Sequence, residues 1–443
     1  MPSETCERAI LVGLDLKGRV SRPGAPKPEF TTSAEESISE LEVLAESAGA
    51  QVVDRVLQSR ETPVAATLIG SGKVDELAAH VKAASIDVVI IDGDLTPTQQ
   101  RNLERLLDCK MVDRTQLILD IFARRARTRE GQLQVELAQL NYLLPRLAGR
   151  GLQMSRLGGG IGTRGPGETQ LEMDRRKISQ RIRKIEGDLD SVRAGRGIQR
   201  RQRQSVPLAT VGLVGYTNAG KSTLFNRLTG AGVVADSRMF ATLDPTVRQF
   251  VLPSNRRVLL SDTVGFIRSL PTTLVKAFRA TLEEVTEAAL LLHVVDASSE
   301  QAPDYTRHVM EVVREIGAES TPQILVLNKL DLLPPGQSDP ELVRERVVGS
   351  LGAGSTAPGA VAVSGLTGEG LPDLLRRIDA MLPMDLVTVE RFHIPHAEGA
   401  AVHMLHEYAH VVSKRVEEEY SEIVAETPES VKRRLIRFLA PGR

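Results

Sequence analysis

The spacing of apolar positions divides the chain into successive regions. From residue 1 to about 112, buried-strand patterns such as SIDVVIID at 85–92 alternate with helical patterns. Ser33 and Glu36 form a capping box for a helix that stops before Gly49. This alternation predicts a small α/β domain over 1–112. Its GSGKVDEL segment does not have the Walker A spacing, so we interpret those glycines as a strand-to-helix turn.

Long helical patterns dominate residues 113–199. One helix is expected over 113–148, and a second stretch of the same character begins near residue 168. The first carries leucines at helical intervals: Leu133, Leu137, Leu140 and Leu144. Two such helices predict an antiparallel hairpin, with the glycine-rich segment LGGGIGTRGPGET at 157–169 as its tip. A linker over 200–207 follows.

The hairpin is strongly basic. Between Arg114 and Arg203 there are 20 basic residues, 18 of them Arg, against 9 acidic ones, so this segment carries +11 and the rest of the chain about −12. Arg favours bidentate contacts with phosphate, which predicts RNA contact; a solvated basic face is the alternative. The candidate RNA-contacting residues are Arg150, Arg156, Gly159, Gly160, Arg164, Gly165, Arg175 and Arg176.

Composition excludes several classes of protein. The 443 residues are 41% hydrophobic and 26% charged, as in ordinary globular proteins, and the longest apolar stretch, AALLLHVV, is too short to cross a bilayer. Cys6 and Cys109 are far apart, which argues against a disulfide framework or a cysteine zinc site. We expect a cytoplasmic monomer without a membrane span.

Residues 208–383 contain the clearest chemistry. The stretch LATVGLVGYTNAGKSTLFNRL predicts a strand, a P-loop and a helix, and hence a mostly parallel sheet with helices on both faces. Backbone N–H groups of this loop would wrap the phosphates, Lys221 would reach the β and γ phosphates, and Ser222 would bind Mg²⁺. The predicted loop contacts are Gly215, Tyr216, Thr217, Asn218, Ala219, Gly220, Lys221, Ser222 and Thr223.

Two segments after the P-loop complete the predicted phosphate site. In LLSDTVGF, Asp262 ends a strand and is suited to hold Mg²⁺, while Gly265 turns its N–H toward the γ phosphate; Thr263 and Val264 lie between them. In MFATLDPT we choose Thr242 to complete the Mg²⁺ shell, with Thr246 as the alternative. The predicted catalytic group is thus Lys221, Thr242 and Gly265, and the metal ligands are Ser222, Thr242 and Asp262.

The base is indicated by VLNKLD at 326–331. The Asp331 carboxylate accepts hydrogen bonds from both N1–H and the exocyclic amine of guanine, whereas adenine presents an acceptor at that edge. GTP and GDP are therefore the expected ligands. The remaining predicted base contacts are Asn328, Lys329 and, from SGLTGEG, Ser364, Gly365 and Leu366.

Two positions bear on catalysis. Phe266 stands where many related GTPases place a glutamine that orients water, so we expect slow intrinsic hydrolysis that something else completes. Asn218 is either a K⁺ ligand beside the phosphates or an ordinary loop residue.

Residues 384–443 predict a small α/β domain. Its expected elements are strands at 386–394, 410–417 and 420–427, a helix at 399–407, and a final helix opened by Thr427 and Pro428. HEYAH at 406–410 matches the pattern of zinc proteases, but it straddles a predicted helix end, and we reject that function.

Taken together, the chain resembles the HflX family of translation-factor-related GTPases. The resemblance covers nearly all of the chain, most specifically DRTQLILDIFARRARTREGQLQVELAQLNYLLPRL and GGGIGTRGPGETQLEMDRR. It implies an α/β multidomain GTPase that binds the large ribosomal subunit, contacting its RNA and proteins, and splits stalled or idle ribosomes.

That resemblance also implies that the hairpin loop points toward the peptidyl-transferase region and that ribosomal RNA or protein orders the switches. Association with ribosomes, or peripherally with a membrane, fits the same picture. Two alternatives stay open: a large-subunit assembly or RNA-remodelling GTPase, and a GTP-gated regulatory switch without splitting activity.

Overall fold

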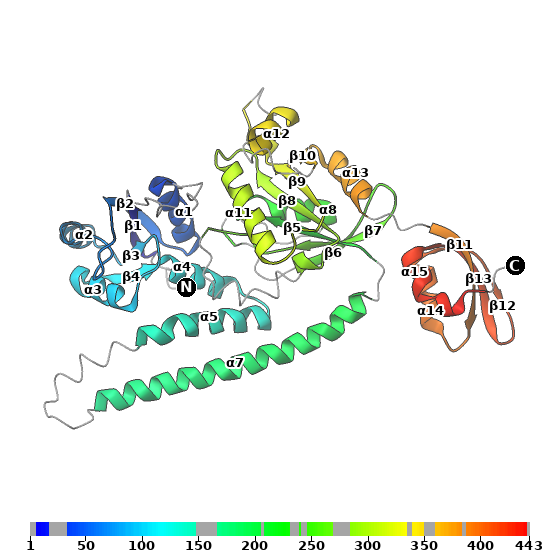
Figure 1. Ribbon diagram of the computed structural model, residues 1–443, viewed down its shortest axis with the longest axis horizontal. Helices are drawn as coiled ribbons and strands as arrows, with labels where there is room; N and C mark the ends of the chain where they lie inside the picture. Colours follow the sequence, from blue (N-terminus) through cyan, green and yellow to red (C-terminus); the bar gives the residue numbers. More distant parts are fainter. Residues whose placement is uncertain are drawn as a thin grey trace, which may run out of the picture.

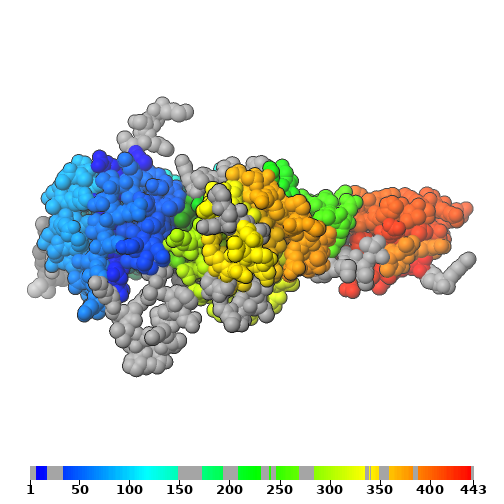
Figure 2. All heavy atoms as spheres, turned by 90° about the horizontal axis from the view of Figure 1, so that it is seen from above, coloured from blue at the N-terminus to red at the C-terminus, as the bar shows by residue number. Residues whose placement is uncertain are grey.

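In its described residues, the computed structural model has three β-sheets with their helices, and a long helical pair (Figure 1). The structure describes residues 6–16, 33–147, 166–204, 208–230, 239–240, 246–268, 284–334, 339–349, 359–382 and 387–440. The predicted α/β multidomain class is confirmed. Seen from above, the N-terminal, central and C-terminal domains follow one another along the long axis (Figure 2).

The N-terminal domain is a parallel sheet with strand order β2-β1-β3-β4. Helix α1 begins where the capping box predicts, since Ser33 Oγ accepts from the Glu36 N–H at 3.1 Å. The elements of this domain are β1 (Arg8–Leu16), α1 (Ala34–Ser47), β2 (Gln51–Arg60), α2 (Ser71–Ala84), β3 (Val88–Ile91), α3 (Pro97–Leu107), β4 (Lys110–Asp113) and α4 (Arg114–Arg125).

The expectation of one helix over 113–148 is wrong, because the chain turns at 126–128 between α4 and α5 (Arg129–Leu147). Thr128 Oγ1 accepts from the Gly131 N–H at 3.0 Å and so caps the start of α5. Ile118 and Phe122 of α4 are fully buried in the core around α1 and the sheet. Helix α4 therefore packs against the N-terminal sheet, while the domain boundary at residue 112 stays a prediction.

The basic hairpin consists of α5 and α7 (Pro166–Gln204), which lie side by side (Figure 1). Leu133 of α5 packs with Ile185 and Leu189 of α7, and Glu136 accepts two hydrogen bonds from Arg181, at 2.6 and 2.8 Å. The predicted hairpin is thereby confirmed.

Helix α7 is longer than expected, running through part of the predicted linker to Gln204. Two glycines in this stretch each cost about 1 kcal/mol, but the Arg, Gln, Ile and Ala residues around them favour a helix.

Most predicted RNA contacts lie outside the described residues: Arg150, Arg156, Gly159, Gly160, Arg164 and Gly165, together with most of the tip. Arg175 and Arg176 are described, and both are exposed on α7. None of the helices in the described ranges is both long and apolar enough to cross a membrane.

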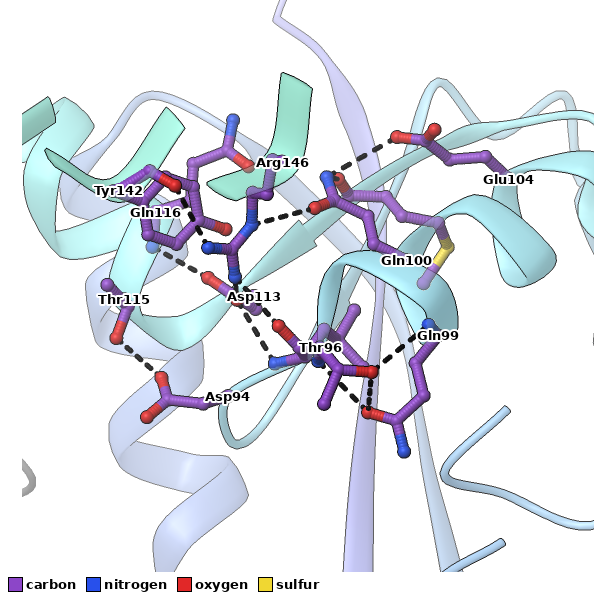
Figure 3. Close-up of polar contacts among 12 residues, drawn as sticks. Asp94, Thr96, Gln99, Gln100, Glu104, Asp113, Thr115, Gln116, Tyr142 and Arg146 are labelled. Atoms are coloured by element: carbon purple, nitrogen blue, oxygen red, sulfur yellow. Dashed lines mark hydrogen bonds and ion pairs between the residues drawn. The ribbon is translucent and has the colours of Figure 1, made fainter. Parts of the chain in front are cut away.

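A polar cluster fixes the end of α5 to the N-terminal domain (Figure 3). Arg146 donates to the Leu95 carbonyl at 2.7 Å and to the buried Asp113 carboxylate at 3.0 Å, and its guanidinium lies 3.4 Å from the centre of the Tyr142 ring. Since Asp113 also caps α4 by accepting from the Gln116 N–H, one carboxylate joins β4, α4 and α5. The N-terminal domain consequently holds the hairpin at the end of α5 that leads into the tip loop.

The central domain is a six-stranded sheet of order β10-β9-β8-β5-β7-β6, in which only β6 is antiparallel to its neighbour. Its parallel strands end at one edge, which gathers the predicted motifs. The elements are β5 (Thr210–Gly215), α8 (Lys221–Thr229), β6 (Thr246–Val251), β7 (Arg257–Asp262), β8 (Leu290–Asp296), α11 (Ala302–Glu315), β9 (Gln323–Asn328), η1 (Leu330–Leu332), α12 (Pro340–Gly349), β10 (Ala360–Ala362) and α13 (Leu371–Met381).

The C-terminal domain is an antiparallel sheet of order β11-β13-β12, and its elements match the predicted ones within two residues at the helix and strand ends. Helix α14 ends before His410, so the two histidines of HEYAH lie on different elements, and within the described ranges no three His, Cys, Asp or Glu residues gather as a metal site. The elements are β11 (Val387–Pro395), α14 (Gly399–Tyr408), β12 (His410–Val416), β13 (Tyr420–Pro428), α15 (Glu429–Arg434) and η2 (Ile436–Phe438).

The N-terminal and central domains share one buried apolar cluster, here called the shared core. Phe122 of α4 packs against Phe240 with ring centres 4.5 Å apart, which ties the segment before β6 to the N-terminal domain. The shared core includes Leu41, Phe122, Val135 and Ala138 from the N-terminal half and Phe240, Val264, Phe266, Ile267 and Val309 from the central domain. Its contacts place the N-terminal domain beside the predicted phosphate site.

Candidate nucleotide-binding site

The P-loop joins the end of β5 to the start of α8. Gly220 has a φ of +91°, and a Cβ there would lie 2.3 Å from Asn328 Nδ2, so the position requires glycine. Asn328 donates from that nitrogen to the Ala219 carbonyl at 2.9 Å. The loop is thus held against β9 with the N-terminus of α8 facing the open edge of the sheet, where backbone N–H groups favour phosphate.

Lys221 is the buried cation of the loop, with 7% of its surface exposed. Its Nζ donates to the carbonyls of Gly215, at 3.1 Å, and Tyr216, at 2.7 Å. Burial lowers the pKa of Lys221 to about 8, although Asp262 opposes the shift. The ammonium group therefore remains mostly charged at neutral pH and would be stabilised by an anion.

Ser222 and Asp262 meet at the predicted metal position. Ser222 Oγ donates to Asp262 Oδ2 at 2.9 Å, and the Asp262 side chain is fully buried. A hydroxyl and a carboxylate at this separation are hard oxygen donors that suit Mg²⁺, which P-loop GTPases generally use. Thr242 lies outside the described residues, whereas the alternative, Thr246, begins β6 and pairs with Asp262 across the β6–β7 ladder.

The predicted base-binding residues converge from β9 and β10. Asn328 Oδ1 accepts from the Gly365 N–H at 2.8 Å, and Asp331 accepts from the fully buried Ser364 hydroxyl. Leu366 is 69% exposed beside them. Ser364 Oγ in turn accepts from the Thr367 N–H at 3.0 Å, so one hydroxyl fixes both the turn and the carboxylate of Asp331.

Three predicted site residues point their side chains away from the phosphate side. The Tyr216 hydroxyl reaches Glu40 of α1, Thr263 Oγ1 donates to the Leu213 carbonyl of β5, and Val264 packs in the shared core. Any contact of these three residues with the nucleotide would therefore be made by backbone atoms. Phe266 is 3% exposed in the same core, so its ring points away from where a water nucleophile would lie.

Several residues near the site were not predicted from the sequence. Asp296, at the end of β8, pairs with Lys329 at 2.7 Å, and its place after an apolar strand was an available signal. His293 is buried in β8, where burial and then the Lys221 charge lower its pKa to about 3. It lines a cavity of about 260 Å³ together with Thr217, Asn218 and Glu40. No local pattern indicates Glu40, which is 176 residues from its partner Tyr216.

Three family models match the chain in succession. Residues 35–123 match "GTP-binding GTPase N-terminal", residues 125–203 match "GTP-binding GTPase Middle Region" and residues 210–329 match "50S ribosome-binding GTPase". The second match covers most of the helical hairpin, and the third contains the P-loop and the base motif.

Curated relatives align with most of the chain. GTPase HflX of Caldanaerobacter subterraneus subsp. tengcongensis is 45% identical over 98% of this chain and 94% of its own length, and GTPase HflX of Escherichia coli K12 is 45% identical over 82% and 83%. Among solved structures, a GTP-binding protein from Sulfolobus solfataricus in complex with GDP is 25% identical, with a TM-score of 0.43 over 85% of this chain and 98% of that one.

Proposed function

The chain belongs to the HflX family of GTPases, and from this membership we propose that it binds the large ribosomal subunit and uses GTP to split or rescue stalled or idle ribosomes. The GTPase activity itself follows from the family. The ribosomal partner is supported by the matching family description and by the basic hairpin.

In the proposed chemistry, Lys221 and the Gly265 N–H hold the γ phosphate while the P-loop amides hold the other phosphates. Ser222, Asp262 and Thr242 are proposed to hold Mg²⁺, which supplies charge neutralisation between the β and γ phosphates. Asp331 selects guanine, and Ser364, Gly365 and Leu366 cover the base.

The observation that carries the ribosomal proposal is the burial of Phe266 in the shared core. A buried phenyl ring cannot orient the attacking water, so hydrolysis needs a further group from outside the described site. The same N-terminal domain that buries Phe266 also holds the loop end of α5 through Arg146. An RNA contact made by the hairpin would therefore be linked, through the N-terminal domain, to the segment around Phe266, where the attacking water would be ordered.

We expect large ribosomal subunits to raise GTP turnover by at least tenfold at low salt, with the stimulation fading as salt increases. The reason is that phosphate contacts of the hairpin release counterions, so the affinity falls steeply with ionic strength. Steady-state phosphate release across a KCl series measures this effect. Stimulation that is independent of salt would contradict a phosphate-dominated contact.

Arginine variants test whether the hairpin makes the salt-dependent contact. Replacing Arg175 and Arg176 with Ala should reduce the slope of log affinity against log salt by about 1.5 to 2. Arg376→Ala with Arg433→Ala removes two equally exposed arginines from α13 and α15 and should leave the slope unchanged. Net separation of ribosomes into subunits under GTP distinguishes splitting from the two alternatives, because assembly factors and pure switches would not separate subunits. Repeating the assay with 157–167 replaced by a short Ser linker tests whether the loop is needed.

Asn218 is proposed as a K⁺ ligand. It is exposed in the P-loop and has a left-handed φ of +61°, and it lies next to the proposed phosphate position. Turnover in KCl should exceed turnover in NaCl by about tenfold, since the cation offsets charge that develops in the transition state. Choline chloride at the same ionic strength is the control. Equal rates in all three salts would leave Asn218 an ordinary loop residue.

A further inference from the structure

The hydroxyl of Tyr216 connects the P-loop to two other parts of the protein. It donates to Glu40 Oε1 of α1 and accepts from the Arg268 N–H at 2.9 Å. The Tyr216 ring stacks on Tyr305 of α11, with centres 4.0 Å apart and planes 10° from parallel. One buried side chain thus joins the N-terminal domain, the P-loop and the segment 263–268 after β7, here called switch II.

Glu40 is held in turn by a buried charge network of the N-terminal domain. Its Oε2 lies 2.8 Å from Arg114, and Arg114 lies 2.8 Å from Asp92 at the end of β3. Burial alone would lower the pKa of Arg114, but Glu40 and then Asp92 raise it, so this guanidinium stays charged. Because losing any one of these buried partners would leave an uncompensated charge, the network favours the arrangement in which Glu40, Arg114 and Asp92 meet.

The segment before β6 rests on the same surface. The Met239 N–H donates to Ser47 Oγ at the end of α1 at 3.1 Å, and Phe240 packs on Phe122 of α4. Both chain segments that flank the phosphate site, before β6 and after β7, are therefore in contact with the N-terminal domain.

Switch II in this arrangement covers the γ-phosphate position. The Thr217 N–H of the P-loop donates to the Phe266 carbonyl at 2.8 Å, and the Phe266 N–H donates to the Gly215 carbonyl at 3.1 Å. Gly265 packs so closely that a Cβ on it would lie 2.9 Å from Lys221 Nζ. Because a γ phosphate must lie between Lys221 and Gly265, GTP binding requires switch II to move away from the P-loop.

We propose that Glu40 is a positioning residue for GTP binding: through the Tyr216 hydroxyl it holds switch II over the γ-phosphate position. GDP leaves this contact intact, whereas GTP must break the bond between Arg268 and Tyr216. Glu40 consequently lowers the affinity for GTP relative to GDP. The proposal rests on the GTPase activity and is independent of the ribosomal partner.

Two variants of the full chain test it by different routes. Tyr216→Phe keeps the stacked ring but removes the hydroxyl that bridges Glu40 and Arg268. The double variant Glu40→Leu with Arg114→Met removes the acceptor together with its charged partner, and leaves Asp92, whose side chain is 11% exposed, as the remaining charge of the network. Glu42→Gln is the matched control, because Glu42 lies on the same helix and pairs with the exposed Arg55.

The measurement is the ratio of affinities for a non-hydrolysable GTP analogue and for GDP, together with kcat and KM for GTP without ribosomes. Both variants should raise the analogue-to-GDP affinity ratio by about tenfold and lower KM for GTP with little change in kcat, as expected for the loss of a hydrogen bond that GTP binding must break. Glu42→Gln should leave the ratio unchanged.

A merely structural role for Glu40 would alter both affinities equally, and that result, or an unchanged or lowered ratio in Tyr216→Phe, overturns the proposal. Circular dichroism verifies the fold of each variant. If the double variant fails to fold, Tyr216→Phe still decides the outcome, because it changes a single oxygen atom.

Discussion

Asp331→Asn should bind xanthosine triphosphate in preference to GTP, with GTP affinity lowered about 100-fold or more. The carboxylate is expected to accept two hydrogen bonds from guanine, whereas the Asn amide donates to the C2 carbonyl of xanthine. Ser364 donates to Asp331 in the present structure, and an Asn carbonyl at 331 retains that contact, so the side chain keeps its orientation. Competition binding with fluorescent guanine and xanthine nucleotides measures the change.

A matched control for the base-specificity change is Asp304→Asn on α11. Asp304 pairs with Arg307 on the surface, away from the base-binding motif, and its loss should leave the preference for guanine intact. Unchanged GTP preference in Asp331→Asn would remove the assignment of this carboxylate to the base.

Lys221→Met should abolish measurable GTP binding while making the nucleotide-free protein more stable. Burial lowers the folded pKa of Lys221 from 10.5 to about 8, so the charged group destabilises the empty fold by about 3 kcal/mol at neutral pH. The sign follows from the lowered pKa: the penalty is complete below pH 8 and disappears as the pH rises from 8 to 10.5. Bound phosphate offsets it in the wild-type protein.

Thermal unfolding tests the lysine prediction. Without nucleotide, Lys221→Met should unfold at a higher temperature than the wild type near pH 7 and at the same temperature near pH 10.5. GTP should raise the unfolding temperature of the wild type only. Lys110→Met, which removes an exposed lysine paired with Glu7, should behave as wild type in both respects. A nucleotide-dependent thermal shift in Lys221→Met would contradict the assigned role.

The hairpin illustrates where sequence patterns succeed and where they fail. Leucines at helical spacing predicted that α5 packs on α7, because a helical stripe of apolar side chains must be buried against something. The break at 126–128 was missed because the capping residue Thr128 lies in a run of arginines that itself favours a helix. Whether such a run stays straight depends on what α4 packs against, and that surface comes from residues far away in the chain.

The nucleotide motifs could be predicted from the sequence because the residues of each motif are close together in the chain. Gly220, Lys221 and Ser222 sit on one turn, and the backbone of that turn supplies the phosphate-binding geometry whatever surrounds it. The same holds for Asp331, which follows a buried strand directly. Parallel strands then bring these separate motifs to one edge of the sheet, so each short pattern predicted a position at that edge.

By itself, the sequence determined the P-loop, the base motif, the basic hairpin and the order of the domains, since each depends on residues near one another in the chain. Only the tertiary structure decided that the Tyr216 side chain reaches Glu40, that Phe266 is buried, and that Tyr216 links switch II to the N-terminal domain. The physical reason is that a buried polar side chain must find a partner wherever folding places one, and that partner lies 176 residues away.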